Sequence, residues 1–98
     1  MASTTLEPTD LESVASGFSA LGDPIRMRIV DALATGQKCV CELLEKIDVA
    51  PNLLSYHLRV LRESGLVDAS RRGRWVDYRL ASDGLDALRH SIPSENTR

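Results

Sequence analysis

Residues 51–65 read PNLLSYHLRVLRESG, and this stretch decides the fold of the chain. Its inward leucines recur at the spacing of one apolar helix face: Leu54, Leu58 and Leu61. Pro51 suits the first helical position because its missing N–H group would have no partner there, and Gly65 suits the end of a helix. The stretch therefore predicts an amphipathic helix from Pro51 to about Ser64.

Three further helices are predicted upstream of this one. Apolar side chains recur at helical spacing from Leu11 to Leu21. Asp23-Pro24 is a capping residue followed by proline, which predicts a second helix that ends at Thr35-Gly36. A third, short helix is expected from about Cys39 to Lys46, with a turn at residues 48–50 before Pro51.

Downstream of Gly65 the apolar pattern changes to the period of a strand. Leu66 to Ser70 predicts one strand, Arg71-Arg72-Gly73 a turn, and Arg74 to Leu80 a second, alternating strand. A last short helix is expected from Asp83 to Ile92. The fold class is therefore mainly α with a β-hairpin wing, a winged helix-turn-helix.

Length and composition are those of one ordinary globular domain. The chain has 98 residues, of which 43% are hydrophobic and 27% charged. We expect residues 1–9 to be a disordered N-terminal tail, 10–92 the winged helix-turn-helix domain and 93–98 a C-terminal tail. No apolar run approaches the roughly 18 residues of a membrane helix, and the N-terminus lacks a signal peptide. We therefore expect a cytoplasmic protein without membrane contact.

A basic stripe on a mildly acidic chain indicates a DNA contact. The net charge is −2, yet residues 59–79 carry six arginines against three acidic residues. The second helix of a helix-turn-helix can enter the major groove, and arginines at a hairpin tip can reach phosphates. The expected DNA-binding residues are Asn52, Ser55, Tyr56, His57, Arg59, Arg71, Arg72 and Arg74. A solvated helix face, or a winged-helix module that binds proteins instead of DNA, is the alternative.

Residues 52–67 and 72–80, together with Leu21-Gly22-Asp23-Pro24, resemble the core of ArsR/SmtB-type repressors. This resemblance implies a homodimer that binds a palindromic double-stranded operator and leaves it when an inducer binds. It also implies that the first and last helices form the dimer interface, with the residues Leu11, Val14, Phe18, Leu85 and Leu88. Many relatives begin the recognition helix with a Ser-Gln-Pro segment, where this chain has Ala50-Pro51-Asn52, which suggests a different operator.

Cys39-Val40-Cys41 resembles the inducer site of arsenic-responsive relatives, which implies arsenite or antimonite as the inducer. Residues two apart on a regular helix point about 200° apart, so one ion can join both thiols only if the helix start deforms. Leu44 stands where such relatives often have a third cysteine. A divalent soft metal (cadmium, lead or zinc), reversible oxidation, or two buried structural cysteines are therefore the alternatives.

Two other readings of the sequence are weaker. Zinc-responsive relatives carry Asp and His ligands on the terminal helix, where this chain has Asp83, Asp86 and His90. These residues are more simply helix-start charges and a surface histidine. A thiol redox enzyme would need Cys-x-x-Cys spacing in a strand–helix setting, which is lacking, so we expect no enzymatic activity and no cofactor for DNA binding.

Overall fold

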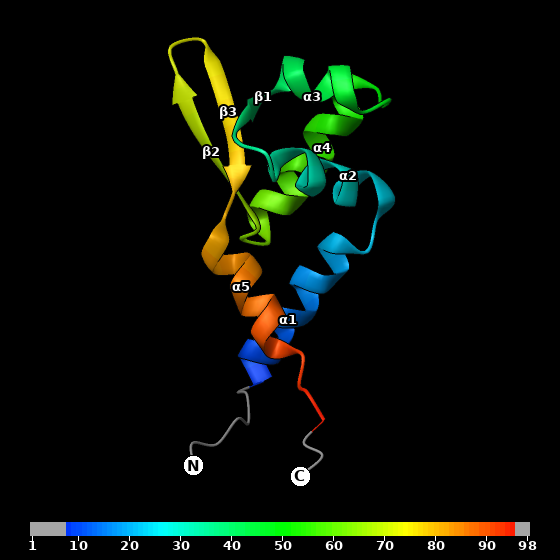
Figure 1. Cartoon of the computed structure of the whole chain (residues 1–98), viewed down its shortest axis with the longest axis vertical. Helices are drawn as coiled ribbons and strands as arrows, with labels where there is room; N and C mark the ends of the chain where they lie inside the picture. Colours follow the sequence, from blue (N-terminus) through cyan, green and yellow to red (C-terminus); the bar gives the residue numbers. More distant parts are fainter. Residues whose placement is uncertain (1–7, 96–98) are drawn as a thin grey trace.

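The computed structural model describes residues 8–95, and the side chains from residue 10 onward. Five helices and three strands follow in order: α1 Pro8–Leu21, α2 Pro24–Leu33, β1 Lys38–Cys39, α3 Val40–Lys46, α4 Pro51–Glu63, β2 Val67–Arg72, β3 Trp75–Leu80 and α5 Ser82–Ser91. Figure 1 shows α1 and α5 together at one end of the long axis, with the β2–β3 hairpin and the start of α4 at the other.

Local hydrogen bonds fix the ends of the helices that position the site. The Asp23 carboxylate accepts hydrogen bonds from the backbone N–H groups of Ile25 and Arg26, at 2.8 and 3.2 Å, so it caps α2. After α4, Gly65 has φ +76°, and the N–H of Leu66 donates to the carbonyl of Leu61 at 3.0 Å. This left-handed closure turns the chain from α4 directly into β2.

The sheet has three antiparallel strands in the order β1-β3-β2, one strand more than the expected hairpin. Lys38 pairs with Tyr78 and Cys39 pairs with Asp77, so Cys39 ends a strand and does not begin the third helix. The turn also differs, because it lies at Gly73-Arg74, while Arg71 and Arg72 belong to β2. Gly73 has φ +63°, which explains why the chain reverses there.

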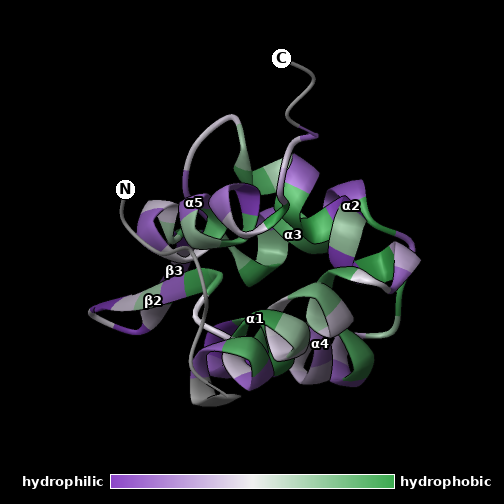
Figure 2. Ribbon diagram, turned by 90° about the horizontal axis from the view of Figure 1, so that it is seen from below, coloured by the Kyte–Doolittle hydropathy of each residue, from purple (hydrophilic) through white to green (hydrophobic). Residues whose placement is uncertain are grey.

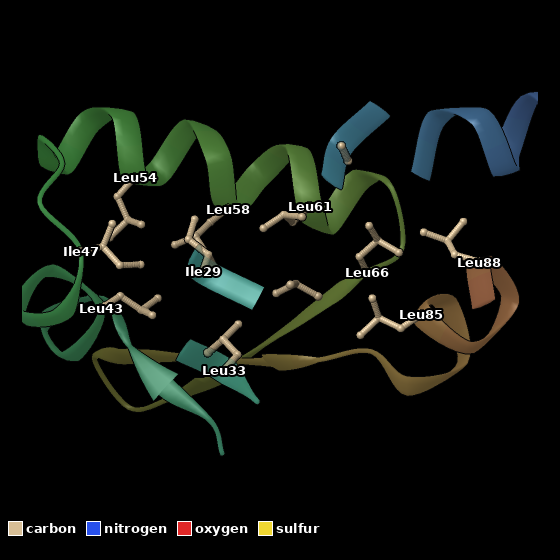
Figure 3. Packing of buried hydrophobic residues seen from close by; sticks show 12 residues of the cluster. Ile29, Leu33, Leu43, Ile47, Leu54, Leu58, Leu61, Leu66, Leu85 and Leu88 are labelled. Carbon is tan, nitrogen blue, oxygen red and sulfur yellow. The ribbon is translucent and has the colours of Figure 1, made fainter. Parts of the chain in front are cut away.

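One apolar core joins α2, α3, α4, the start of β2 and α5. Figure 3 shows the leucines of α4 facing Ile29 of α2, with Leu43 and Ile47 beside Leu54. Leu85 and Leu88 of α5 are buried in this same core. Both also line a groove with Phe18 of α1, so their expected place in a dimer interface stays a prediction.

The expected domain limits need one adjustment. Helix α1 begins at Pro8, two residues before the predicted start of the domain at residue 10. Helix α5 ends at Ser91, and residues 93–95 lie outside any helix or strand. Residues 1–7 and 96–98 of the two expected tails lie outside the described residues. No helix within residues 8–95 combines the length and apolarity needed to cross a membrane.

Candidate DNA interface and two-thiol site

Helix α4 presents one polar face to solvent. Leu54, Leu58 and Leu61 are fully buried, which turns the opposite side of the helix outward. That side carries the exposed residues Asn52, Ser55, Tyr56 and Arg59. Amide, hydroxyl and guanidinium groups in this arrangement can donate to or accept from base edges and phosphates.

His57 does not belong to this face, contrary to the expectation from its place in the sequence. Its side chain is 9% exposed, and its Nδ1 atom lies 2.9 Å from a guanidinium nitrogen of Arg26. A guanidinium can only donate, so Nδ1 accepts and the ring proton sits on Nε2. Arg26 also donates to the Ala20 carbonyl at 2.6 Å, so His57 helps to join α1, α2 and α4.

The β2–β3 hairpin, residues 67–80 and here called the wing, projects from the body with a hydrophilic tip (Figure 2). Arg71 and Arg74 are exposed there, as expected for phosphate contacts. Arg72 instead folds back on Asp77, with its Nε and second terminal nitrogen 2.8 and 3.2 Å from the two carboxylate oxygens. This pairing lowers the pKa of the Asp77 carboxyl, so Asp77 stays ionised although it is buried.

The two thiols lie where β1 passes into α3. Cys39 is extended, with φ −85° and ψ 171°, and is half-buried, whereas Cys41 is exposed in the first turn of α3. Both line a shallow pocket of about 230 Å³ with Val40. Its other wall is formed by Arg74 of the turn and by Trp75, Val76 and Tyr78 of β3. The pocket therefore joins the cysteines to the wing.

Glu42 holds the backbone of this site in place. Its carboxylate accepts a hydrogen bond from the Cys39 N–H at 2.9 Å, which lowers the pKa of Glu42. The acid is thus engaged with the chain itself and not with the pocket. No group of three or more His, Cys, Asp or Glu side chains in residues 8–95 converges as a metal site. The two cysteines that line one pocket are therefore the soft ligands that this protomer offers there.

The terminal-helix residues Asp83, Asp86 and His90 do not form such a group either. Asp86 pairs with Arg89 at 2.5 Å in the next turn of α5. Asp83 lies in the first turn of α5, where its charge stabilises the helix start. The structure therefore favours the helical role of these acids over zinc binding.

A second apolar surface lies on α1 and its neighbours. Leu11 and Phe18 are 53% and 37% exposed, and Val14 is partly buried against the core. Phe18 lines a groove of about 230 Å³ together with Met27 of α2 and Ile92 after α5. Met27 and Ile92 are exposed as well, although the sequence pattern did not single them out. Exposed apolar residues around a groove are typical of a surface that another molecule covers.

Sequence reasoning missed two residues near the candidate site. Leu53 is exposed on the polar side of α4. Its position outside the stripe of Leu54, Leu58 and Leu61 could have indicated this exposure from the sequence. Asp77 is a carboxylate in the central strand, and the alternation of 74–80 placed it on one face with Trp75 and Arg79. Asp77 is buried because β1 pairs with it on one side and Arg72 on the other. The alternation within a single strand predicts neither of these neighbours.

Known regulatory proteins resemble this chain in sequence. The sequence profile of the bacterial arsR family of regulatory proteins matches residues 23–69. The chain is 43% identical over 81 residues to a Synechocystis protein named "Transcriptional repressor SmtB homolog". This match covers 83% of this chain and 61% of that relative. It is 34% identical over 80 residues to an "Arsenical resistance operon repressor" of Staphylococcus xylosus, covering 82% of this chain and 77% of that one.

A solved structure shares the fold. It is the solution structure of a homodimeric winged helix-turn-helix DNA-binding domain from Mycobacterium bovis, described as a possible ArsR-family regulator. The match has a TM-score of 0.75 and 29% identity, and it covers 92% of this chain and 85% of that one. The fold is thus a winged helix-turn-helix, and this chain belongs to the ArsR family of bacterial regulatory proteins.

Proposed function

We propose that this chain is a transcriptional repressor that leaves its operator when trivalent arsenic or antimony binds Cys39 and Cys41. The observation that carries the proposal is the pocket in which both thiols face the start of the wing. A ligand held there lies against an element that touches DNA in a winged helix-turn-helix. Relatives named as SmtB and as arsenical resistance repressors support the regulatory role.

The DNA contact that we propose combines α4 and the wing. Asn52, Ser55, Tyr56 and Arg59 would read base edges in the major groove, and Arg71 and Arg74 would hold phosphates. A protein with this task works in the cytoplasm, beside the chromosome. Arg72 contributes charge to the wing, although its fork is already occupied by Asp77.

The two-thiol site suits arsenite better than a divalent metal. Each thiol that joins arsenous acid replaces one hydroxyl group, which leaves as water, so two protein thiols leave one position for hydroxide or a small external thiol. Zinc instead takes four ligands in structural thiolate sites. The described residues offer no third thiolate, imidazole or free carboxylate at the pocket.

We further propose that the protein acts as a homodimer on a palindromic operator. The exposed apolar residues of α1, α2 and the end of α5 supply the interface, and the Mycobacterium bovis structure is homodimeric. Phe18→Glu should give monomers in sedimentation at micromolar concentration and weaken operator binding at least about tenfold, while Phe18→Leu should remain dimeric. Monomeric wild-type protein would refute this part of the proposal.

The inducer assignment is tested by fluorescence anisotropy on labelled duplex DNA taken from upstream of the gene. Cys39→Ser, Cys41→Ser and the double variant serve as probes, and because the chain has only two cysteines the double variant has no thiol. Arsenite should release the wild type and none of the three variants, and every variant should bind DNA as the wild type does. Glu45→Gln, an exposed change on α3, is the matched control and should respond like the wild type.

The alternatives give different results in the same assay. Release by cadmium but not by arsenite would assign the site to a divalent metal. Release by peroxide, reversed by a reducing agent, would assign it to oxidation. Arsenite release that persists in the variant without thiols would contradict the site itself.

A further inference from the structure

Asp77 connects the two-thiol site to the wing. It lies in β3 between two strands, paired in register with Cys39 of β1 and with Ser70 of β2. Its side chain is 6% exposed and holds both sides of the Arg72 fork, while the Arg72 side chain is 66% exposed. Gln37, just before β1, lies 3.5 Å from the same carboxylate. One carboxylate therefore touches the segment that carries Cys39 and an arginine of the wing.

The pairing between β1 and β3 is small. It consists of two residue pairs, Lys38 with Tyr78 and Cys39 with Asp77. Cys39 is also the residue that precedes the first turn of α3, and its N–H is held by Glu42. A ligand that draws Cys39 and Cys41 together acts directly on one of these two pairs. Since α3 packs on α2, β1 and β3, the sheet is the nearest structure able to carry the displacement.

We propose that Asp77 is a positioning residue that couples the thiols to DNA through the wing, by holding Arg72 only while β1 is paired with β3. This inference rests on the proposed function. With β1 in place, the two-point ion pair fixes the direction of the guanidinium and of the end of β2 that bears it. When Cys39 is displaced, Asp77 loses the strand that covers it, and the wing is no longer held in its DNA-binding position.

The test is the release ratio, the operator Kd with arsenite divided by the Kd without it. Arg72→Lys keeps the positive charge for DNA but loses the planar fork, and Asp77→Asn keeps the shape but loses the charge. Each should lower the release ratio at least about fivefold, the low end of usual coupling between two sites, and the double variant should lower it no further. Arsenite affinity measured without DNA should stay within about threefold, because both thiols remain.

Asp68→Asn is the matched control. Asp68 lies on the same hairpin, 4.0 Å from Arg79, with 55% of its side chain exposed, and it is not paired with β1. It should leave the release ratio unchanged. Wild-type ratios in both Arg72→Lys and Asp77→Asn would overturn the proposal.

A second arm keeps the inference independent of arsenite. In a Cys41→Ser background, methyl methanethiosulfonate converts the Cys39 thiol to a methyl disulfide and releases methanesulfinic acid. This modification should raise the operator Kd. The factor by which it raises the Kd should be at least about fivefold smaller when Arg72→Lys is also present. If arsenite does not release the wild type from DNA but this result is obtained, arsenite is refuted as the inducer, and the coupling of Cys39 to the wing is retained. Equal weakening in both backgrounds, or none in either, would overturn the coupling.

Discussion

At the residue scale, Asp23 makes the start of α2 sensitive to acid. The Arg26 N–H, joined by that of Ile25, lowers the pKa of this carboxyl. A carboxyl with a lowered folded pKa stabilises the protein above its unfolded pKa of about 3.9, and this contribution is lost as the pH falls through the folded value. Asp23→Asn keeps a capping oxygen without the charge, so its urea midpoint should fall less steeply than that of the wild type between neutral pH and pH 3. Parallel curves would contradict this assignment.

Trp75 offers a direct view of the two-thiol pocket. It is the only tryptophan in the chain, and it lines the pocket with Cys39 and Cys41. A ligand joined to the thiols changes the surroundings of the indole, so we predict a saturable change in its emission with one arsenite per protomer. The variant without thiols should show no change, and Cys39→Ser alone should show at most a weak, non-stoichiometric one.

The sequence predicted single residues well where one helix period settles their direction. Asn52, Ser55, Tyr56 and Arg59 followed from the leucine stripe of α4 and are exposed as expected. The burial of His57 and the pairing of Arg72 with Asp77 could not be predicted, because each partner lies outside the period of one helix or strand. Arg26 is 31 positions away from His57 in the chain, and Asp77 lies across the hairpin from Arg72. The expected DNA contact of Arg72 stays a prediction.

At the scale of elements, α5 is tightly seated on the end of α4. A Cβ atom added to Gly84 would stand 1.9 Å from the Gly65 carbonyl oxygen, and that backbone is fixed by the closure of α4. Gly84→Ala must push the two elements apart and should cost about 1–3 kcal/mol or more in the free energy of unfolding, measured by urea denaturation.

Gly17→Ala on α1 is the informative counterpart. Its added Cβ would meet the methyl groups of Leu88, the nearest at 2.8 Å, and these can rotate away. Alanine also favours a helix interior by about 1 kcal/mol over glycine. The two effects oppose each other, so the unfolding free energy should change by less than about 1 kcal/mol. A Gly17→Ala loss as large as that of Gly84→Ala would show that α1 and α5 cannot adjust.

The wing should act mainly through phosphates. Arg71→Gln and Arg74→Gln should each weaken binding to operator and to unrelated duplex alike, and lower the slope of log K against log salt by about one. Asn52→Ala on α4 should instead reduce the preference for operator over unrelated DNA, with the slope unchanged. Anisotropy titrations at several salt concentrations separate these two patterns.

The elements show where a sequence pattern stops being informative. The helices followed from their apolar period and their end signals, such as Asp23-Pro24 and Gly65. Strand β1 was missed because two residues have no period, and because its partner Tyr78 lies 40 positions further along the chain than Lys38. That missed strand is what brings Cys39 beside the wing.

At the scale of the whole molecule, two surfaces lie at opposite ends of the long axis. The start of α4 and the tip of the wing form the end that we assign to DNA, and α1 with α5 forms the end that we assign to the second protomer (Figure 1). The thiol pocket lies on the sheet side of the DNA end, against β3. A ligand there can alter the DNA surface while the assigned dimer surface stays intact, so release should not require dissociation of the dimer.

The most direct measurement is the affinity of the reduced wild-type protein for its own upstream DNA, by fluorescence anisotropy, with and without stoichiometric arsenite. We predict tight, salt-dependent binding without arsenite and at least a tenfold higher Kd with it, equivalent to about 1.4 kcal/mol of coupling. Binding that is no tighter than to unrelated duplex, or that arsenite leaves unchanged, would contradict the account of an arsenite-released repressor.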